Sequence, residues 1–168
     1  MTKTELIACI QRAFHGVTLA DGIGLWEAQG LDGYADAATI IHLRKLDERD
    51  NRANIPLKEL ARNGSSLSFF DPKGMRFCLP AFLLYDLQKE ELNRLYGFPL
   101  HDSVVFTLCN ESTEQFSQSR FSLFHSQQIQ CVIAFLEFQI KNSEEEESDI
   151  QSGIAWWKSF EVFQTTLK

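Results

Sequence analysis

The stretch that decides the fold is SLSFFDPKGMRFCLPAFLLY, residues 66–85. Asp71 followed by Pro72 is typical of a helix start, because Asp accepts hydrogen bonds from free backbone N–H groups and Pro lacks an N–H that the first turn cannot use. The residues from 75 to 84 are apolar on almost every side, which favours a helix at the centre of a domain. Pro80 removes one backbone hydrogen bond, so we expect this buried central helix to kink or restart near Phe77.

Arg76 is the exception within this apolar stretch. An arginine on a buried helix has to extend its charged end toward water or pair with an acid. We therefore expect Arg76 to form a structural ion pair or a contact with a helix cap, rather than an anion-binding site.

Helical periodicity on either side predicts further long helices. Thr2 and Glu5 match a capping box at the start of a helix over residues 4–15. Apolar residues recur at helical spacing over 126–141, where Ser126 is the expected cap, and again over 149–164. The predicted fold is a mainly α, single compact domain over residues 1–168, in which these three helices wrap the central helix.

Short helices and one ambiguous segment are predicted between the long helices. We predict short helices over 25–34, 36–46 and 57–62, the second capped by Asp36 with Ile40 and Ile41 facing inward. Residues 103–109 (SVVFTLC) have the composition of a buried strand, yet no partner strand is evident, and a lone strand leaves its backbone groups unpaired. We favour a buried helix or an extended segment there, and the choice between strand and helix stays open.

The overall charge argues against several functions. Sixteen Lys and Arg face 23 Asp and Glu in 168 residues, a net charge of −7, and no three basic residues are consecutive. Binding to DNA or RNA depends on clustered Lys and Arg, so nucleic acid is not an expected partner. No apolar stretch has the length of a signal peptide or a membrane helix, so we expect a cytoplasmic protein that does not bind membranes.

Familiar catalytic and cofactor motifs are missing from the sequence. It contains no CxxC, HExxH, GxxxxGK[ST], GxGxxG or GxSxG motif. The four Cys residues, each among apolar neighbours, are expected to be buried reduced thiols. We therefore expect no catalytic residue, metal or cofactor.

Charge is most concentrated over residues 137–149, which hold six acids and one base, or −5 of the net −7. The acids are Glu137, Glu144, Glu145, Glu146, Glu147 and Asp149. They form either a solvated loop between helices or a patch that attracts a basic protein. Adjacent Trp156 and Trp157 point about 100° apart on a helix, so we expect one in the core and one partly exposed. We assign Trp156 as the candidate partner contact.

Three segments together resemble a bacterial family of unknown function. The central segment, residues 69–83 (FFDPKGMRFCLPAFL), is similar to its Leu-x-Phe-Leu-x-Pro-x-x-Phe-Arg-Phe-Tyr-Leu-Pro-Ala motif, with Met75 in place of an aromatic residue and Cys78 in place of Tyr. Residues 23–34 (IGLWEAQGLDGY), and 121–124 (FSLF) with 127–136 (QQIQCVIAFL), are similar to its flanking segments. The resemblance covers most of residues 5–160. It implies a small, mainly helical cytoplasmic protein of a kind found among toxin-immunity genes.

Two functional hypotheses follow. The first is a protein-binding module, most concretely an immunity-type inhibitor that binds and blocks a basic toxin. The alternative is an enzyme or small-ligand binder with a site near Arg76, Tyr85 and His125, and a structural or regulatory subunit is not separable from the first hypothesis. The sequence does not indicate the oligomeric state.

Overall fold

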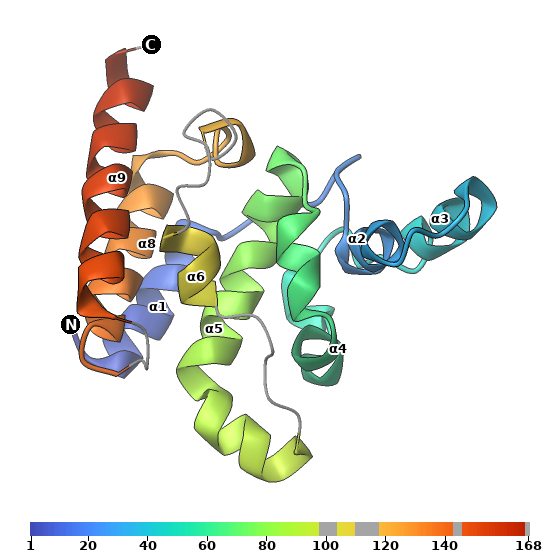
Figure 1. Ribbon diagram of the computed structural model, residues 1–168, viewed down its shortest axis with the longest axis horizontal. Coiled ribbons are helices and arrows are strands. Elements are labelled where there is room, and N and C mark those ends of the chain that lie inside the picture. Colours follow the sequence, from blue (N-terminus) through green and yellow to red (C-terminus); the bar gives the residue numbers. More distant parts are fainter. Residues whose placement is uncertain (98–103, 110–117, 143–145, 167–168) are drawn as a thin grey trace.

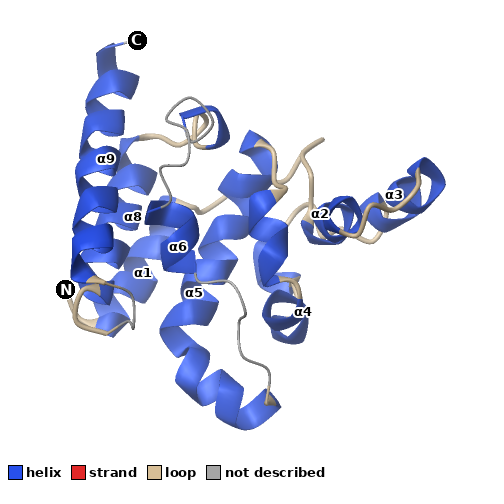
Figure 2. Ribbon diagram, in the orientation of Figure 1, coloured by secondary structure: helices blue, strands red, loops and turns tan. Residues whose placement is uncertain are grey.

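A computed structural model describes residues 1–97, 104–109, 118–142 and 146–166. These ranges contain helices and loops and no strand, so the mainly α prediction is confirmed (Figure 2). The α-helices are α1 (Lys3–Ala13), α2 (Leu25–Asp32), α3 (Ala37–Arg44), α4 (Leu57–Arg62), α5 (Pro72–Tyr96), α6 (Val104–Cys109), α8 (Ser126–Gln139) and α9 (Glu147–Thr166). Two short 3-10 helices are η1 (Arg52–Asn54) and η2 (Gly64–Ser68).

The central helix α5 starts as the sequence predicts. The Asp71 carboxylate accepts the backbone N–H of Gly74 at 2.8 Å, and also the N–H of Ile23 at 2.9 Å. It therefore caps α5 and fixes the α1–α2 loop at the same time. The helix runs through Pro80 without a break, so the restart expected near Phe77 does not occur. Burial of the residues around Pro80 stabilises the helix despite the lost hydrogen bond.

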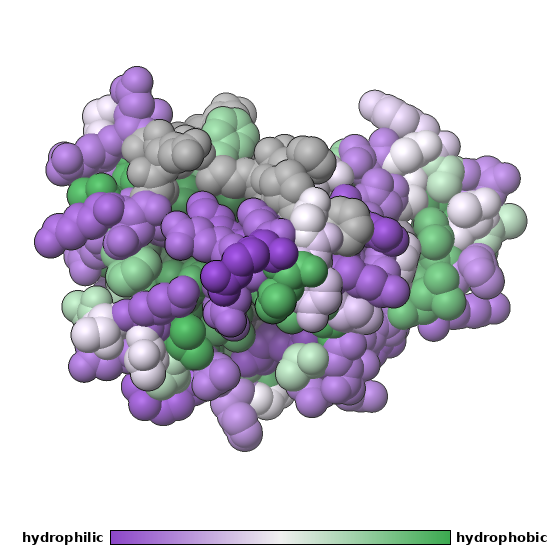
Figure 3. Space-filling view, turned by 90° about the horizontal axis from the view of Figure 1, so that it is seen from below, coloured by the Kyte–Doolittle hydropathy of each residue, from purple (hydrophilic) through white to green (hydrophobic). Residues whose placement is uncertain are grey.

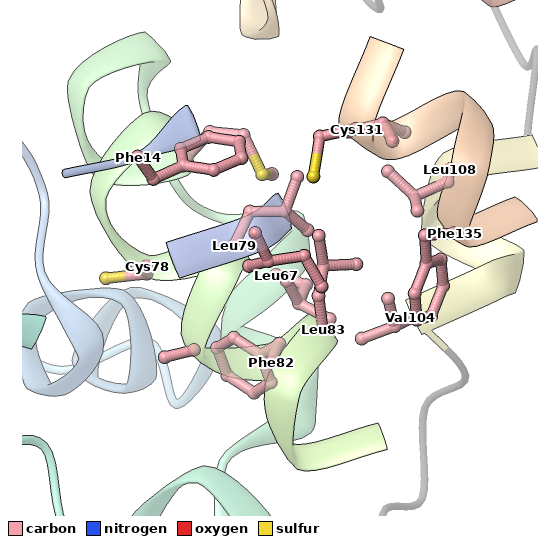
Figure 4. Packing of buried hydrophobic residues seen from close by; sticks show 14 of the residues in the cluster. Phe14, Leu67, Cys78, Leu79, Phe82, Leu83, Val104, Leu108, Cys131 and Phe135 are labelled. Atoms are coloured by element: carbon pink, nitrogen blue, oxygen red, sulfur yellow. The ribbon is translucent and has the colours of Figure 1, made fainter. Parts of the chain in front are cut away.

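The core lies around α5 and receives buried residues from helices on both sides of it, from α1, α8 and α9 as well as from α2 and α4. In Figure 1, α1, α8 and α9 lie on one side of α5, and α2, α3 and α4 on the other. Helix α1 packs directly on α5, whereas α9 packs on α8 and α6. The wrapping of α5 is thus layered, with α9 outermost. Figure 4 shows the packing; its labelled residues are Phe14, Leu67, Cys78, Leu79, Phe82, Leu83, Val104, Leu108, Cys131 and Phe135.

Residues 104–109, which the sequence left undecided, form helix α6. The backbone carbonyl of Leu108 accepts the indole N–H of Trp157 at 3.1 Å. Gly153 of α9 lies against Cys109, where an added Cβ would be 2.6 Å from its sulfur. The missing side chain at Gly153 therefore lets the two helices approach closely.

Helix α3 extends from one end of the molecule (Figure 1). None of its residues is buried, and Ile41 is 57% exposed, so the expected inward orientation of Ile41 is wrong. The reason is that α3 packs mainly on α2, where Ile40 and Leu43 approach Gly30, whereas Ile41 lies on the exposed side of the helix. Figure 3 shows hydrophobic side chains gathered at this end of a largely hydrophilic face.

The start of α8 differs from the prediction by one residue. Its cap is His125, whose N–H donates to Oε1 of Gln128 at 3.3 Å. The hydroxyl of Ser126, the expected cap, donates instead to Glu161 of α9.

Candidate functional site

The acidic cluster lies at the turn between α8 and α9. Glu137, Glu146, Glu147 and Asp149 are all exposed, while Glu144 and Glu145 lie outside the described residues. Within the described ranges, none of these four carboxylates pairs with a Lys or Arg, since the ion pairs found there are elsewhere. The N-terminus lies beside this turn (Figure 1).

Part of this cluster has a structural explanation. Glu147 and Asp149 are in the first turn of α9, where the helix dipole favours negative charge. Glu147 also accepts a hydrogen bond from the amide of Gln151 at 2.7 Å, one turn along the helix. Both carboxylates nevertheless face solvent, so helix capping leaves their charge accessible to a partner.

The two adjacent tryptophans differ in burial, as the sequence predicts. Trp157 is fully buried, and Trp156 is half-buried. The Trp156 ring stacks on Phe160 at 5.0 Å between ring centroids with 9° between planes, and its centroid is 6.1 Å from that of Phe121. No acceptor for the Trp156 indole N–H is present in the part of the chain that the structure describes. Trp156 is therefore a fixed aromatic side chain with an available donor.

Asp149, Trp156 and Phe163 share one line along α9. They are seven residues apart, which is nearly two full turns, so successive members are about 10 Å apart on the same side of the helix. Phe163 is 45% exposed and Asp149 is exposed. The line thus runs from the acidic turn to two accessible aromatic rings.

Arg76 and His125 come together in the structure, and Tyr85 does not join them. Arg76 and His125 line one pocket, whereas the Tyr85 hydroxyl donates to Asn93 at 3.2 Å elsewhere on α5. Arg76 forms no ion pair with a described residue. Its Nε donates to Oε1 of Gln128 at 3.0 Å, so its contact is with the side chain that caps α8.

Sequence reasoning missed Gln128, which is fully buried. The available signal was its position four residues before Val132 and seven before Phe135, which places it on the buried side of α8. It also missed Asp47, which is 9% exposed and accepts the backbone N–H of Trp26 at 2.7 Å. Burial raises the pKa of the Asp47 carboxyl to about 6, against the opposing effect of its backbone hydrogen bonds to Trp26 and Glu27.

The cysteines are free in the described structure. Cys78 and Cys131 are buried, and burial raises the pKa of both thiols, which disfavours the nucleophilic thiolate. Cys9 and Cys109 are half-buried rather than buried. Among the described residues no group of His, Cys, Asp and Glu is placed to hold a metal ion, and no helix is long and apolar enough to cross a membrane.

Comparison with known proteins gives a family and no characterised relative. No curated protein and no solved structure matches the chain. A family model matches residues 2–161, nearly the whole sequence. The protein therefore belongs to DUF6714, a family of unknown function.

Proposed function

We propose that this protein is a binding module for a basic protein, and that its specific role is that of an immunity-type inhibitor which covers a basic toxin. The observation that carries the proposal is the line on α9 that joins exposed, unpaired carboxylates to the half-buried Trp156. Charge attracts the partner and the aromatic side chain supplies apolar contact.

The charge distribution supports attraction over a distance. Residues 137–149 contribute −5 of the net −7, and their described acids are not neutralised by neighbouring cations. A concentrated field of one sign accelerates association with an oppositely charged protein and is weakened by salt. Binding through this surface should accordingly weaken when the Debye length falls below about 10 Å.

Trp156 supports a defined contact rather than charge attraction alone. Tryptophan is among the residues that contribute most to binding energy at interfaces. Because its ring is held between Phe160 and Phe121, little side-chain entropy is lost when a partner covers it. Its free indole N–H adds one directional hydrogen bond.

A pair of matched variants tests the acidic turn. Glu146→Gln with Glu147→Gln removes two adjacent exposed carboxylates from the turn, and Glu90→Gln with Glu91→Gln removes two from α5. Both variants change the net charge equally. Each is used to capture proteins from the native host's lysate at low and at high salt, with mass spectrometric identification.

The expected result is a basic protein that wild type and the Glu90/Glu91 variant retain at low salt, and that the Glu146/Glu147 variant loses. The isolated partner is then assayed for toxicity with and without this protein. Equal retention by both variants would remove the acidic turn from the interface. A captured partner whose activity is unchanged by the complex would contradict the inhibitor role.

A further inference from the structure

A pocket of about 360 Å³ lies where the α1–α2 loop meets the starts of α5 and α8. Three separate parts of the chain build it. Its lining residues are His15, Gly16, Val17, Thr18, Ala20, Lys73, Arg76, Leu123 and His125.

The pocket is basic although the chain is acidic. Four of its lining residues are Lys73, Arg76, His15 and His125, and no Asp or Glu is among the lining residues that the structure describes. Lys73 forms an ion pair with Asp21, an exposed residue outside the lining. Arg76 has no carboxylate partner in the described ranges, so its full positive charge lies at a half-buried position.

The guanidinium of Arg76 is held in place by Gln128. The Gln128 amide nitrogen donates to the carbonyl of Ala13 at 3.1 Å, which fixes its oxygen toward Arg76 Nε and the N–H of His125. Because Gln128 is fully buried, this arrangement is rigid. It occupies Nε only and leaves the two terminal nitrogens of Arg76 without an acceptor among the described residues.

The α1–α2 loop offers further donors. Gly16 adopts a left-handed backbone conformation with φ of 72°, which turns the chain at the pocket. The backbone N–H groups of Gly16 and Thr18 donate to no acceptor in the described part of the chain. The N–H of Val17, which lies between them, donates to the carbonyl of Phe14 at 3.3 Å, so two of these three N–H groups remain available to an anion.

We propose that this pocket binds the phosphoryl group of a small phosphate monoester. The free guanidinium nitrogens can bind two oxygens of one group, as Arg does with phosphate. Donors from three chain segments surround the space, which suits the three oxygens of a phosphoryl group better than the two coplanar oxygens of a carboxylate. The volume is within the range of small-molecule sites and leaves room for the esterified part.

This proposal does not depend on the acidic turn or on Trp156. A failure to bind a basic protein leaves it standing, and its own failure leaves the proposed function standing, because the two sets of variants share no residue.

The test is isothermal titration calorimetry of the full chain with ribose 5-phosphate, inorganic phosphate, citrate and neutral ribose. Arg76→Gln removes the positioned cation. Arg94→Gln removes a cation from the exposed end of the same helix and controls for net charge. His15→Ala alters an exposed lining residue, so it still tests the pocket if the Arg76 variant loses its helical circular dichroism signal.

We expect saturable binding of ribose 5-phosphate, weakened about tenfold or more by Arg76→Gln, weakened also by His15→Ala, and unchanged by Arg94→Gln. Equal binding of inorganic phosphate identifies free phosphate as a ligand of the same site, and weaker binding shows that the sugar contributes. The proposal is overturned if no phosphate compound saturates, if citrate alone binds, or if Arg94→Gln weakens binding as much as Arg76→Gln.

Discussion

Asp47 makes the stability of this protein depend on pH in an unusual direction. Its Oδ1 accepts the N–H of Trp26 at the start of α2, and its buried Oδ2 has no hydrogen-bond partner. The carboxyl group lies directly over Gly24, where an added Cβ would be 2.2 Å from Cγ. Burial therefore raises the pKa of Asp47 from 3.8 to about 6, although the backbone N–H groups favour the ionised form.

The direction and size of this pH effect on the free energy of unfolding follow from proton linkage. A carboxyl whose pKa is higher in the folded state binds its proton more tightly when folded. Its contribution to stability is complete below pH about 4, near the unfolded pKa, and is lost as the pH rises through about 6. A shift of about two pKa units corresponds to about 3 kcal/mol. Asp47 alone should thus make the protein more stable at pH about 4 than at pH about 7.

The measurement is urea unfolding, followed by far-ultraviolet circular dichroism at several pH values, of wild type and Asp47→Asn. Asparagine keeps an oxygen for the Trp26 N–H but does not titrate. Subtracting the two free energies of unfolding cancels groups whose pKa is lowered, such as Glu48, which makes the opposite contribution. Asp50→Asn, at an exposed position three residues away, is the control for charge. The free energy of unfolding of wild type minus that of Asp47→Asn should rise as the pH falls from about 7 to about 4. If this difference does not change with pH, or decreases as the pH falls, the account of Asp47 is refuted.

Three further predictions concern packing and capping. Gly153→Val should destabilise the protein by about 1–3 kcal/mol, because its Cβ meets Cys109, whereas Gly33→Ala, with no contact under 3.4 Å, should be nearly neutral in thermal unfolding. Asp71→Ala should cost about 2 kcal/mol in urea unfolding, since it removes a cap and leaves a second N–H without its acceptor. Cys78 should resist thiol labelling in native protein and react fully in denaturant, because it is 1% exposed and burial raises its pKa; rapid native labelling would contradict its burial.

The parts of the fold that sequence reasoning predicted correctly are those with local causes. The capping box of Thr2 and Glu5 is formed, and Asp71 caps α5, because each depends on residues within one helical turn. The orientation of Ile41 was wrong because exposure depends on what packs against α3, and its own periodicity carries no information on that. The composition of residues 104–109 did not distinguish a strand from a helix, because their conformation depends on packing against α9, which is distant in the sequence.

The two candidate sites differ in the same respect: one depends on residues close together in the sequence, and the other on contacts between distant segments. The acids of the acidic turn are close together in the sequence, so its negative charge could be predicted from the sequence alone. The basic pocket depends on residues 15, 73, 76 and 125, which no spacing rule connects, and on Gln128, whose amide joins Arg76 to the end of α1. The predicted cap contact of Arg76 is present, yet it uses a neutral amide, so it positions the guanidinium without neutralising it. Because Arg76 contacts an amide and not a carboxylate, its positive charge remains available in the pocket. Which of these partners lies next to Arg76 is determined only by how α5 and α8 pack together in the folded chain.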